Sequence, residues 1–194
     1  MLPRYRVSWI RQGERLVALE PTEDEVRACA DELAAAYNEE HNRTMMANTV
    51  AATPAEVVTL YADMQRAGGR PFLLYRGDTL MGDADLRRVG EGRAEFAIMV
   101  GSRPLQGRGW GTRFGLMLHR LAFEELRLER VYATILPKNT ASLRLFARLG
   151  YVRDDSGAAR AFADYADDVA MSVSRHEFER AHGATLGEIA WTVR

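Results

Sequence analysis

Polar and apolar residues alternate at the start of the chain, where Tyr5, Val7 and Trp9 would share one face of an extended segment. This period of two predicts a strand over residues 4–10 and, after a turn, a second strand over residues 15–20. Beyond these strands the apolar period lengthens to three or four residues, which is the period of an amphipathic helix. The chain is therefore expected to begin as a hairpin and to continue into a helix.

Two helices are marked by capping boxes, in which a threonine is followed three residues later by a glutamate. Thr22 with Glu25 begins the first helix, and Thr53 with Glu56 begins the second. Residues 38–53, which connect the two helices, have no clean period. They predict a connection with at most a short helical turn.

The rest of the chain predicts strands that are joined first by turns and then by helices. Residues 71–76, 79–86 and 93–100 predict an antiparallel meander, which a strand–helix–strand–helix–strand pattern follows. Residues 187–194 also have strand character and would either pair across a homodimer or finish the sheet. The pattern predicts one domain over residues 1–194 with an α/β (α+β) fold. Its mixed, mostly antiparallel sheet of about seven strands would carry helices on both faces.

Charge, cysteine and histidine content narrow the function classes. The formal net charge of −1 offers no general basic surface for nucleic acid and no polybasic patch for a membrane. Cys29 is the only cysteine, and its place on the apolar face of the first predicted helix favours a core role over that of a nucleophile. The four histidines do not cluster at metal-ligand spacing, so no metal site is expected.

Neither a membrane span nor a secretory segment is expected. No apolar run approaches the length that crosses a bilayer, and the N-terminal residues lack the long apolar core of a signal peptide. The sequence therefore predicts a cytoplasmic protein.

A glycine-rich segment, residues 106–112, follows a predicted strand and opens a predicted helix. Glycine lets a backbone approach a ligand closely, and the first turn of a helix carries unpaired N–H groups and the positive end of the helix dipole. The segment is therefore expected to bind an anion, with Arg108 and Arg113 as charged partners. It is not the dinucleotide fingerprint, because Thr112 and Phe114 stand where that pattern needs glycine. It also lacks the lysine of the P-loop.

The pattern that remains is Gln-x-x-Gly-x-Gly, at Gln106, Gly109 and Gly111. It resembles the pyrophosphate-binding signature of the GNAT N-acetyltransferase superfamily. A second motif of that family, Asn-x-x-Ser-x-x-Leu-Phe-x-x-Leu-Gly-Tyr, follows at residues 139–151 after a helix and a strand. The resemblance reaches back to Arg15, so it covers most of the chain. It implies acetyl-CoA as a co-substrate, no metal, and direct transfer of an acetyl group to a primary amine in a ternary complex.

The resemblance also implies which residues hold acetyl-CoA. They lie at the end of one strand, in the glycine-rich segment and at the start of a later helix. They are Ile98, Met99, Val100, Gln106, Gly107, Arg108, Gly109, Trp110, Gly111, Thr112, Asn139 and Ser142. Backbone N–H groups near Met99 and Val100 would pair with the pantetheine arm, and the thioester would lie where this strand splays from the strand of residues 131–136. Asn139 has a second interpretation as a helix N-cap, and the two are compatible.

Transfer to an amine needs a group that removes a proton, because an amine with a pKa of about 10 is almost entirely protonated at neutral pH. By resemblance, Glu95 is expected to be the general base, acting through water, and Tyr151 the general acid for the departing thiolate. Asp83 and Asp85 are alternative bases. They alternate on one strand and so share a face, where they could also attract a cationic amine.

By analogy with the family, the connection at residues 38–53 would cover the acceptor pocket. Its candidate lining residues are His41, Asn42, Arg43, Met45 and Met46. The acceptor itself stays open among small amines, polyamines, antibiotics and protein N-termini. Two other classes are a non-catalytic acyl-CoA-binding regulatory protein and a nucleotide- or NAD-binding module, and the glycine spacing disfavours the second of these.

Overall fold

The structure is a computed structural model that describes residues 3–47 and 50–194. Asn48 and Thr49, within the connection expected to cover the acceptor pocket, lie outside the described residues, as do Met1 and Leu2. The strands are β1 (Tyr5–Arg11), β2 (Glu14–Leu19), β3 (Arg70–Arg76), β4 (Thr79–Gly90), β5 (Arg93–Val100), β6 (Arg130–Ile135), β7 (Val152–Arg153), β8 (Val169–Ser174) and β9 (Ile189–Val193). The helices are α1 (Glu23–Asn38), α2 (Glu40–Met45), α3 (Pro54–Arg66), η1 (Arg103–Leu105), α4 (Trp110–Arg120), η2 (Leu121–Glu125), α5 (Thr140–Arg148), α6 (Gly157–Arg160) and α7 (Arg175–Leu186).

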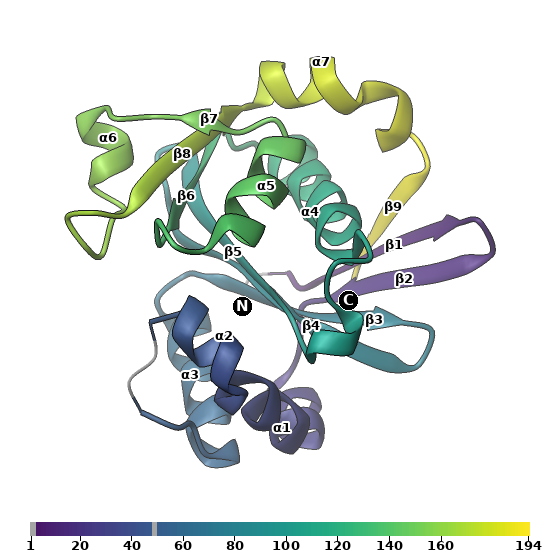
Figure 1. Ribbon diagram of the computed structural model, residues 1–194. Helices are drawn as coiled ribbons and strands as arrows, with labels where there is room; N and C mark the ends of the chain where they lie inside the picture. The colour runs from purple at the N-terminus through teal and green to yellow at the C-terminus, as the bar shows by residue number, and fades with distance from the viewer. Residues whose placement is uncertain (1–2, 48–49) are drawn as a thin grey trace.

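One mixed sheet organises the molecule, with the strand order β7-β8-β6-β5-β4-β3-β2-β1-β9 (Figure 1). Every neighbouring pair is antiparallel except β5 and β6, which run parallel. The expected mostly antiparallel α/β sheet is therefore confirmed. The described residues form nine strands rather than about seven, because the two-residue β7 and the terminal β9 also join the sheet.

Helices cover both faces of the sheet, as expected. The helices α1 and α3 lie on one face, where Val26 and Leu33 of α1 and Val57 of α3 pack with Leu73 and Met99 of the sheet. The helices α4, α5 and α7 lie on the other face (Figure 1). Both predicted capping boxes are formed, at the start of α1 and of α3.

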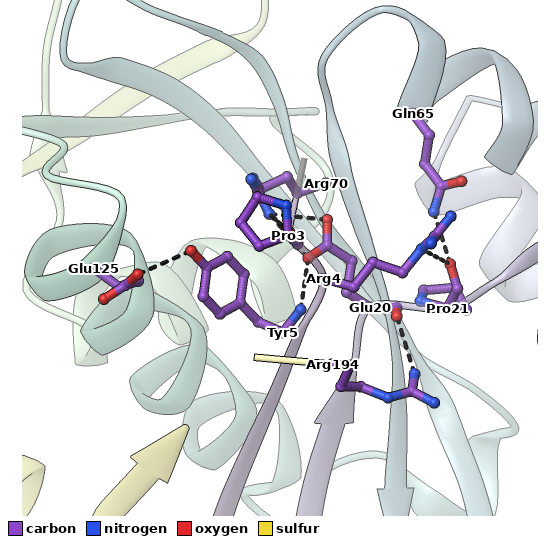
Figure 2. A network of polar contacts seen from close by, with 9 residues as sticks. All are labelled: Pro3, Arg4, Tyr5, Glu20, Pro21, Gln65, Arg70, Glu125 and Arg194. Atoms are coloured by element: carbon purple, nitrogen blue, oxygen red, sulfur yellow. Dashed lines mark hydrogen bonds and ion pairs between the residues drawn. The ribbon is translucent and has the colours of Figure 1, made fainter. Parts of the chain in front are cut away.

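The two ends of the chain meet at the β9 side of the sheet. The strand β9 pairs with β1, so it finishes the sheet of its own chain. Figure 2 shows the polar network beside it, in which Glu20 and Arg70 form a buried ion pair with 2.9 Å between Oε2 and Nη1. The backbone N–H of Tyr5 and the side chain of Arg194 donate to Glu20 as well. This network fixes β1, β2 and β3 to one another.

The strands β5 and β6 separate after a short parallel stretch. Only three residue pairs join them, ending at Glu95 opposite Tyr132, although β5 continues to Val100 and β6 to Ile135. Beyond that point β5 stays paired with β4, and β6 stays paired with β8. The splay that the sequence predicted is present, and it leaves one edge of β5 without a strand partner.

Candidate active site

Two adjoining cavities lie along the unpaired part of β5. The acceptor cavity, as we call the first, has a volume of 410 Å³ and is lined by residues of α1, α3, β4 and β5 and of the loop after α6. The cofactor cavity has a volume of 400 Å³ and is lined by β5, the glycine-rich segment and the helices α2, α4 and α5. Six residues line both cavities, and they mark the junction between the two: Met45, Met46, Ile98, Met99, Asn139 and Ser142.

The glycines of the cofactor cavity have two different roles. Gly107 and Gly109 have φ angles of 72° and 82°, in the left-handed region that favours glycine, and a side chain there would meet no atom within 4 Å. They shape an open turn that leads into α4. Gly111 instead allows close packing of helices, because a Cβ atom at this position would lie 2.5 Å from Cδ1 of Leu145 on α5. The glycine-rich segment thus combines an open loop with a tight helix contact.

The side chain of Gln106 holds the loop in place. Its Nε2 donates to the carbonyl oxygens of Val100 and Gly101, both at 3.0 Å, and to Oδ1 of Asn42 at 2.9 Å. Asn42 is buried on α2 and donates to the carbonyl of Gly101 in turn. The predicted cofactor residue Gln106 therefore has its side-chain amide occupied in joining the loop, β5 and α2.

Two arginines that the motif did not indicate line the cofactor cavity. Arg144 and Arg148 are four residues apart on α5, so they share one side of that helix. Arg108 is exposed and does not line either cavity. Arg113 is turned away, with its guanidinium 4.8 Å from the ring centre of Trp110 and 3.3 Å from a carboxylate oxygen of Glu14. Arg144 and Arg148 are therefore the arginines found in the lining of the cofactor cavity, and the binding roles of Arg108 and Arg113 stay predictions.

The backbone of β5 presents its hydrogen-bonding groups to the two edges alternately. The carbonyl of Met99 points toward β4, since a Cβ atom on Gly82 would lie 2.0 Å from its oxygen. The N–H groups of Ile98 and Val100 therefore point to the opposite edge, which β6 has left. The donors expected near Met99 and Val100 are accordingly those of Ile98 and Val100.

Asn139 and Ser142 lie at the junction of the two cavities. Asn139 is the N-cap of α5, as predicted, and its Oδ1 accepts from the backbone N–H of Ser142 at 3.1 Å. Its Nδ2 also donates to the carbonyl of Met45 at 3.3 Å, which links α5 to α2 across the junction. The side chains of both residues line both cavities.

Asp83 and Asp85 project from β4 into the acceptor cavity. Asp83 accepts hydrogen bonds from the hydroxyl groups of Tyr37 and Tyr61, the latter at 2.8 Å. Burial raises its pKa, and these two hydroxyl groups oppose that rise. Asp85 has one oxygen, Oδ1, that is buried and accepts no hydrogen bond within the described residues. Burial, opposed by Arg87 and assisted by Asp83 and Glu95, raises the pKa of Asp85 to about 7.

Glu95 lies behind the acceptor cavity and does not line it. Its side chain is 2% exposed, and its Oε1 accepts a hydrogen bond of 2.7 Å from the hydroxyl of Thr134. Its Oε2 is 3.4 Å from Nε of Arg87. The expected base is therefore placed next to the site, with Thr134 and Arg87 between it and the cavity.

Tyr151, the expected general acid, lies in the core on the α4 side of the sheet. Its side chain lines neither cavity, and its hydroxyl is 2.5 Å from Nε2 of the buried His119. Burial, with a smaller effect of Glu95, raises its pKa well above the ordinary value. Phe146, which packs against its ring at 4.9 Å, lines the acceptor cavity in its place. The hydroxyl of Tyr151 therefore lies outside the lining of both cavities in this structure, and its role as the general acid stays a prediction.

The connection at residues 38–53 contributes less to the acceptor cavity than expected. It forms the short helix α2, from which only Met45 and Met46 of the five candidate residues line that cavity. His41 and Asn42 line the cofactor cavity, and Arg43 lines a third, more open cavity of 470 Å³. Residues that sequence reasoning missed complete the acceptor cavity from α1, α3 and the loop after α6, among them Tyr37, Leu60, Tyr61, Met64, Asp164 and Tyr165.

Other expected features were the core position of Cys29 and the lack of a metal site. Cys29 is buried between α1 and α3, and burial raises its pKa to about 11, so its thiol is a poor nucleophile. Among residues 3–47 and 50–194, no group of three or more His, Cys, Asp or Glu side chains is arranged to hold a metal ion. Within the same ranges, no helix has the length and apolar character needed to cross a membrane.

Comparisons with known proteins agree with this geometry. The family model described as an acetyltransferase (GNAT) domain matches residues 15–152, which is more than half of the chain. The chain therefore belongs to the GNAT family of N-acetyltransferases. A relative, the SPbeta prophage-derived uncharacterized N-acetyltransferase YokL of Bacillus subtilis, is 32% identical over 82 residues. That alignment covers 41% of this chain and 46% of YokL, so it spans less than half of the relative.

Two solved structures share the fold. RimJ of Mycobacterium smegmatis in complex with CoA-disulfide has a TM-score of 0.75 at 15% identity, over 99% of this chain and 100% of that one. Aminoglycoside acetyltransferase AAC(6')-Ib in complex with coenzyme A and kanamycin has a TM-score of 0.70 at 18% identity, over 86% of this chain and 99% of that one. At these identities the similarity establishes a common architecture.

Proposed function

We propose that this protein transfers an acetyl group from acetyl-CoA to a primary amine held in the acceptor cavity, by direct attack in a ternary complex. The observation that carries the proposal is the junction of the two cavities along the free edge of β5. A donor in one cavity and an acceptor in the other would meet there, and this proximity converts a bimolecular reaction into an effectively unimolecular one.

The cofactor cavity fits the phosphates and the pantetheine arm of CoA. The open turn at Gly107 and Gly109 and the uncapped first turn of α4 offer backbone N–H groups to an anion, and Arg144 and Arg148 add positive charge. The hydroxyl of Thr112, in that first turn, is buried and has no hydrogen-bond partner within the described residues. A polar atom of this kind indicates a ligand group, because buried polar groups are almost always paired.

Asp85 is the group best placed to remove the proton of the amine. At neutral pH only about one amine in a few thousand is uncharged, so a base near the nucleophile increases the reactive fraction. Asp85 lines the acceptor cavity, keeps one oxygen without a hydrogen bond in the described structure, and has a pKa of about 7. Asp83 is engaged by two tyrosines, and Glu95 lies outside the cavity. We therefore favour Asp85 over both.

Groups at the junction of the two cavities would carry out each step of the transfer. Asp85 takes one proton from the ammonium, and the amine nitrogen attacks the thioester carbon to form the new C–N bond. As the tetrahedral intermediate collapses, the C–S bond breaks and the second proton lost by the nitrogen passes to the sulfur, which leaves as the thiol of CoA. The N–H groups of Ile98 and Val100 would stabilise the oxyanion that develops. A thiol has a pKa near 8.5, so the departing thiolate needs little help from an acid. Ser142 lines both cavities, and its hydroxyl would donate a hydrogen bond to the sulfur in this proposal.

The proposal is tested by two measurements on the intact chain. Calorimetry with acetyl-CoA, ADP and NAD should show tight binding of acetyl-CoA alone. An amine panel that includes small monoamines, polyamines, aminoglycosides and peptide N-termini should then release free CoA thiol with at least one class of acceptor. Preferential binding of NAD, or binding of acetyl-CoA without thiol release from any amine, would refute the transfer.

A further inference from the structure

Arg87 lines the acceptor cavity with a guanidinium that makes no hydrogen bond to any residue in the described parts of the chain. A guanidinium carries five N–H donors in a planar fork. The nearest partners of Arg87 are Oδ1 of Asp85 at 3.3 Å and Oε2 of Glu95 at 3.4 Å, both measured from Nε. The two carboxylates therefore hold the Nε edge in place by charge and leave the donors of the fork without hydrogen bonds.

The neighbouring Arg88 differs from Arg87 because its guanidinium is hydrogen-bonded to other residues of the protein. Its Nη1 donates to the carbonyl of Phe162 and its Nη2 to Oδ1 of Asp164, each at 2.8 Å. It does not line the acceptor cavity. Arg88 thus donates hydrogen bonds to the loop after α6, whereas Arg87 faces the acceptor cavity and donates none to the described residues.

The sheet sets the distance between Arg87 and the proposed base. Arg87 stands opposite Glu95 and two residues from Asp85 on the same face of β4. Two residues along a strand separate the Cα atoms by about 7 Å, whereas Oδ1 of Asp85 and Nε of Arg87 approach to 3.3 Å, so the free donors of the fork lie on the side of Arg87 away from Asp85. Asp85, opposite Ala97, is nearer to the junction of the cavities than Arg87 is. An acceptor whose amine lies at Asp85 would therefore extend along β4 toward the guanidinium.

We propose that Arg87 binds an anionic group of the acceptor, so that the acceptor is a zwitterion with its amine at Asp85 and its carboxylate at the free N–H donors of the Arg87 guanidinium. This inference rests on the proposed function and adds the chemical class of the acceptor. Asp83, Asp85, Asp164 and Asp168 also line the cavity, and Arg87 is the cation among its described lining residues that would oppose a second ammonium group placed against it. Polyamines and other polycations would be poorer acceptors than amino acids of matching length.

Three acceptors of equal chain length test the inference. They are δ-aminovalerate with a carboxylate, δ-aminovaleramide with a neutral amide, and cadaverine with a second amine. Wild-type protein should have a kcat/KM for δ-aminovalerate at least about tenfold above that for the amide, and higher still above that for cadaverine. Comparable values for the three acceptors, or a preference for cadaverine, would overturn the inference.

Substitutions of Arg87 test whether this side chain is responsible for the preference for the carboxylate acceptor. Arg87→Gln should bring the carboxylate-to-amide ratio close to one, and Arg87→Lys should restore part of it, because lysine keeps the charge and loses the fork. Arg88→Gln is the matched control. It removes a cation that is also 3.8 Å from Glu95 but does not line the cavity, and it should keep the wild-type ratio. Retention of the ratio in Arg87→Gln would assign the preference elsewhere and reject the role of Arg87.

A binding measurement separates this inference from the proposed function. The products N-acetyl-δ-aminovalerate and N-acetyl-δ-aminovaleramide are titrated calorimetrically into wild-type and Arg87→Gln protein in the presence of CoA. At least tenfold tighter binding of the anionic product by wild type alone supports the role of Arg87, even if no amine releases thiol. Equal affinity of the two products for wild type overturns it, even if transfer to other amines occurs.

Discussion

The hydroxyl of Tyr151 lies 2.5 Å from Nε2 of His119, and both side chains are enclosed by the rings of Phe96, Phe146 and Phe178. The Nδ1 atom of His119 is 2.7 Å from the carbonyl oxygen of Gly115, which can only accept a hydrogen bond. Nδ1 therefore carries the proton of the neutral ring, and Nε2 accepts from the tyrosine. Tyr151, in the segment before β7, thus donates a hydrogen bond to His119 of α4 within the core.

Tyr151→Phe should therefore lower stability and leave catalysis intact. The change leaves the buried Nε2 of His119 without a donor, which costs about 1–3 kcal/mol of unfolding free energy. Urea unfolding measures that loss, and thiol release under conditions where the variant is folded should give a kcat close to that of wild type. A kcat lowered by tenfold or more with unchanged unfolding would return Tyr151 to the role of general acid.

The contribution of His119 to stability should be lost as the solution is acidified below about pH 6.5, and Asp85, whose pKa is raised by burial, contributes in the opposite sense over the same range. Burial lowers the pKa of His119 to about 4, from an ordinary value of 6.5, so between these values the unfolded chain binds a proton that the folded chain excludes. The contribution is fully present above pH 6.5 and is lost as pH falls to about 4, with a loss of about 3 kcal/mol.

Urea unfolding at a series of pH values measures that loss. His119→Gln, which cannot titrate and is less stable at neutral pH, lacks this contribution, so its stability deficit relative to wild type should shrink as pH falls from 6.5 to 4. His176→Gln, at an exposed position, should keep the wild-type slope. A stability difference between wild type and His119→Gln that does not change between pH 4 and 6.5 would contradict a neutral buried His119.

The rate of transfer should rise with pH through about 7. Asp85 has a pKa of about 7 and acts as a base only after losing its proton, so activity falls on the acid side of that value. Asp85→Asn should lower kcat by about a hundredfold or more and remove this inflection. Glu95→Gln should have the smaller effect, because Glu95 lies outside the cavity. The exposed Asp78→Asn serves as the control, and the reverse order of effects would make Glu95 the base.

The arginine pair on α5 should strengthen the binding of acetyl-CoA. Arg144→Gln and Arg148→Gln should each weaken it severalfold, since a partly exposed ion pair is worth up to about 1 kcal/mol. The difference from wild type should shrink as salt is added, because salt screens exposed charges. Arg153→Gln, an exposed arginine that pairs with Asp155 and does not line the cofactor cavity, should have no effect. Equal affinities for all these proteins would place the phosphates elsewhere.

The sequence predicted best what depends on local chemistry. The glycine-rich loop, the capping boxes and the cap at Asn139 each involve residues that are close in the chain. Alternation also placed Asp83 and Asp85 on one face of β4. The alternation could not show which of the two is the better candidate base. Their environments differ because Tyr37 of α1 and Tyr61 of α3, which are distant in the chain, donate hydrogen bonds to Asp83.

The directions of side chains depend on the packed structure and could not be predicted from the sequence. Gly150 has a φ of 91° and turns the chain before Tyr151, so that the tyrosine enters the core beside His119. Nothing in the local sequence indicates that direction. The spacing of Arg144 and Arg148 was, by contrast, a signal available in the sequence, since residues four apart share a helix face.

At the free edge of β5, the proposed contacts to the thioester come from backbone N–H groups, whereas the contacts to the acceptor come from side chains. The N–H groups of Ile98 and Val100 persist through any substitution except proline, so thioester handling tolerates sequence drift along this strand. The acceptor cavity, by contrast, is built from side chains on β4, α1, α3 and the loop after α6. The class of amine that is accepted can therefore change through substitutions at lining residues such as Arg87, while Asp85 and the main-chain donors of the proposed transfer are kept.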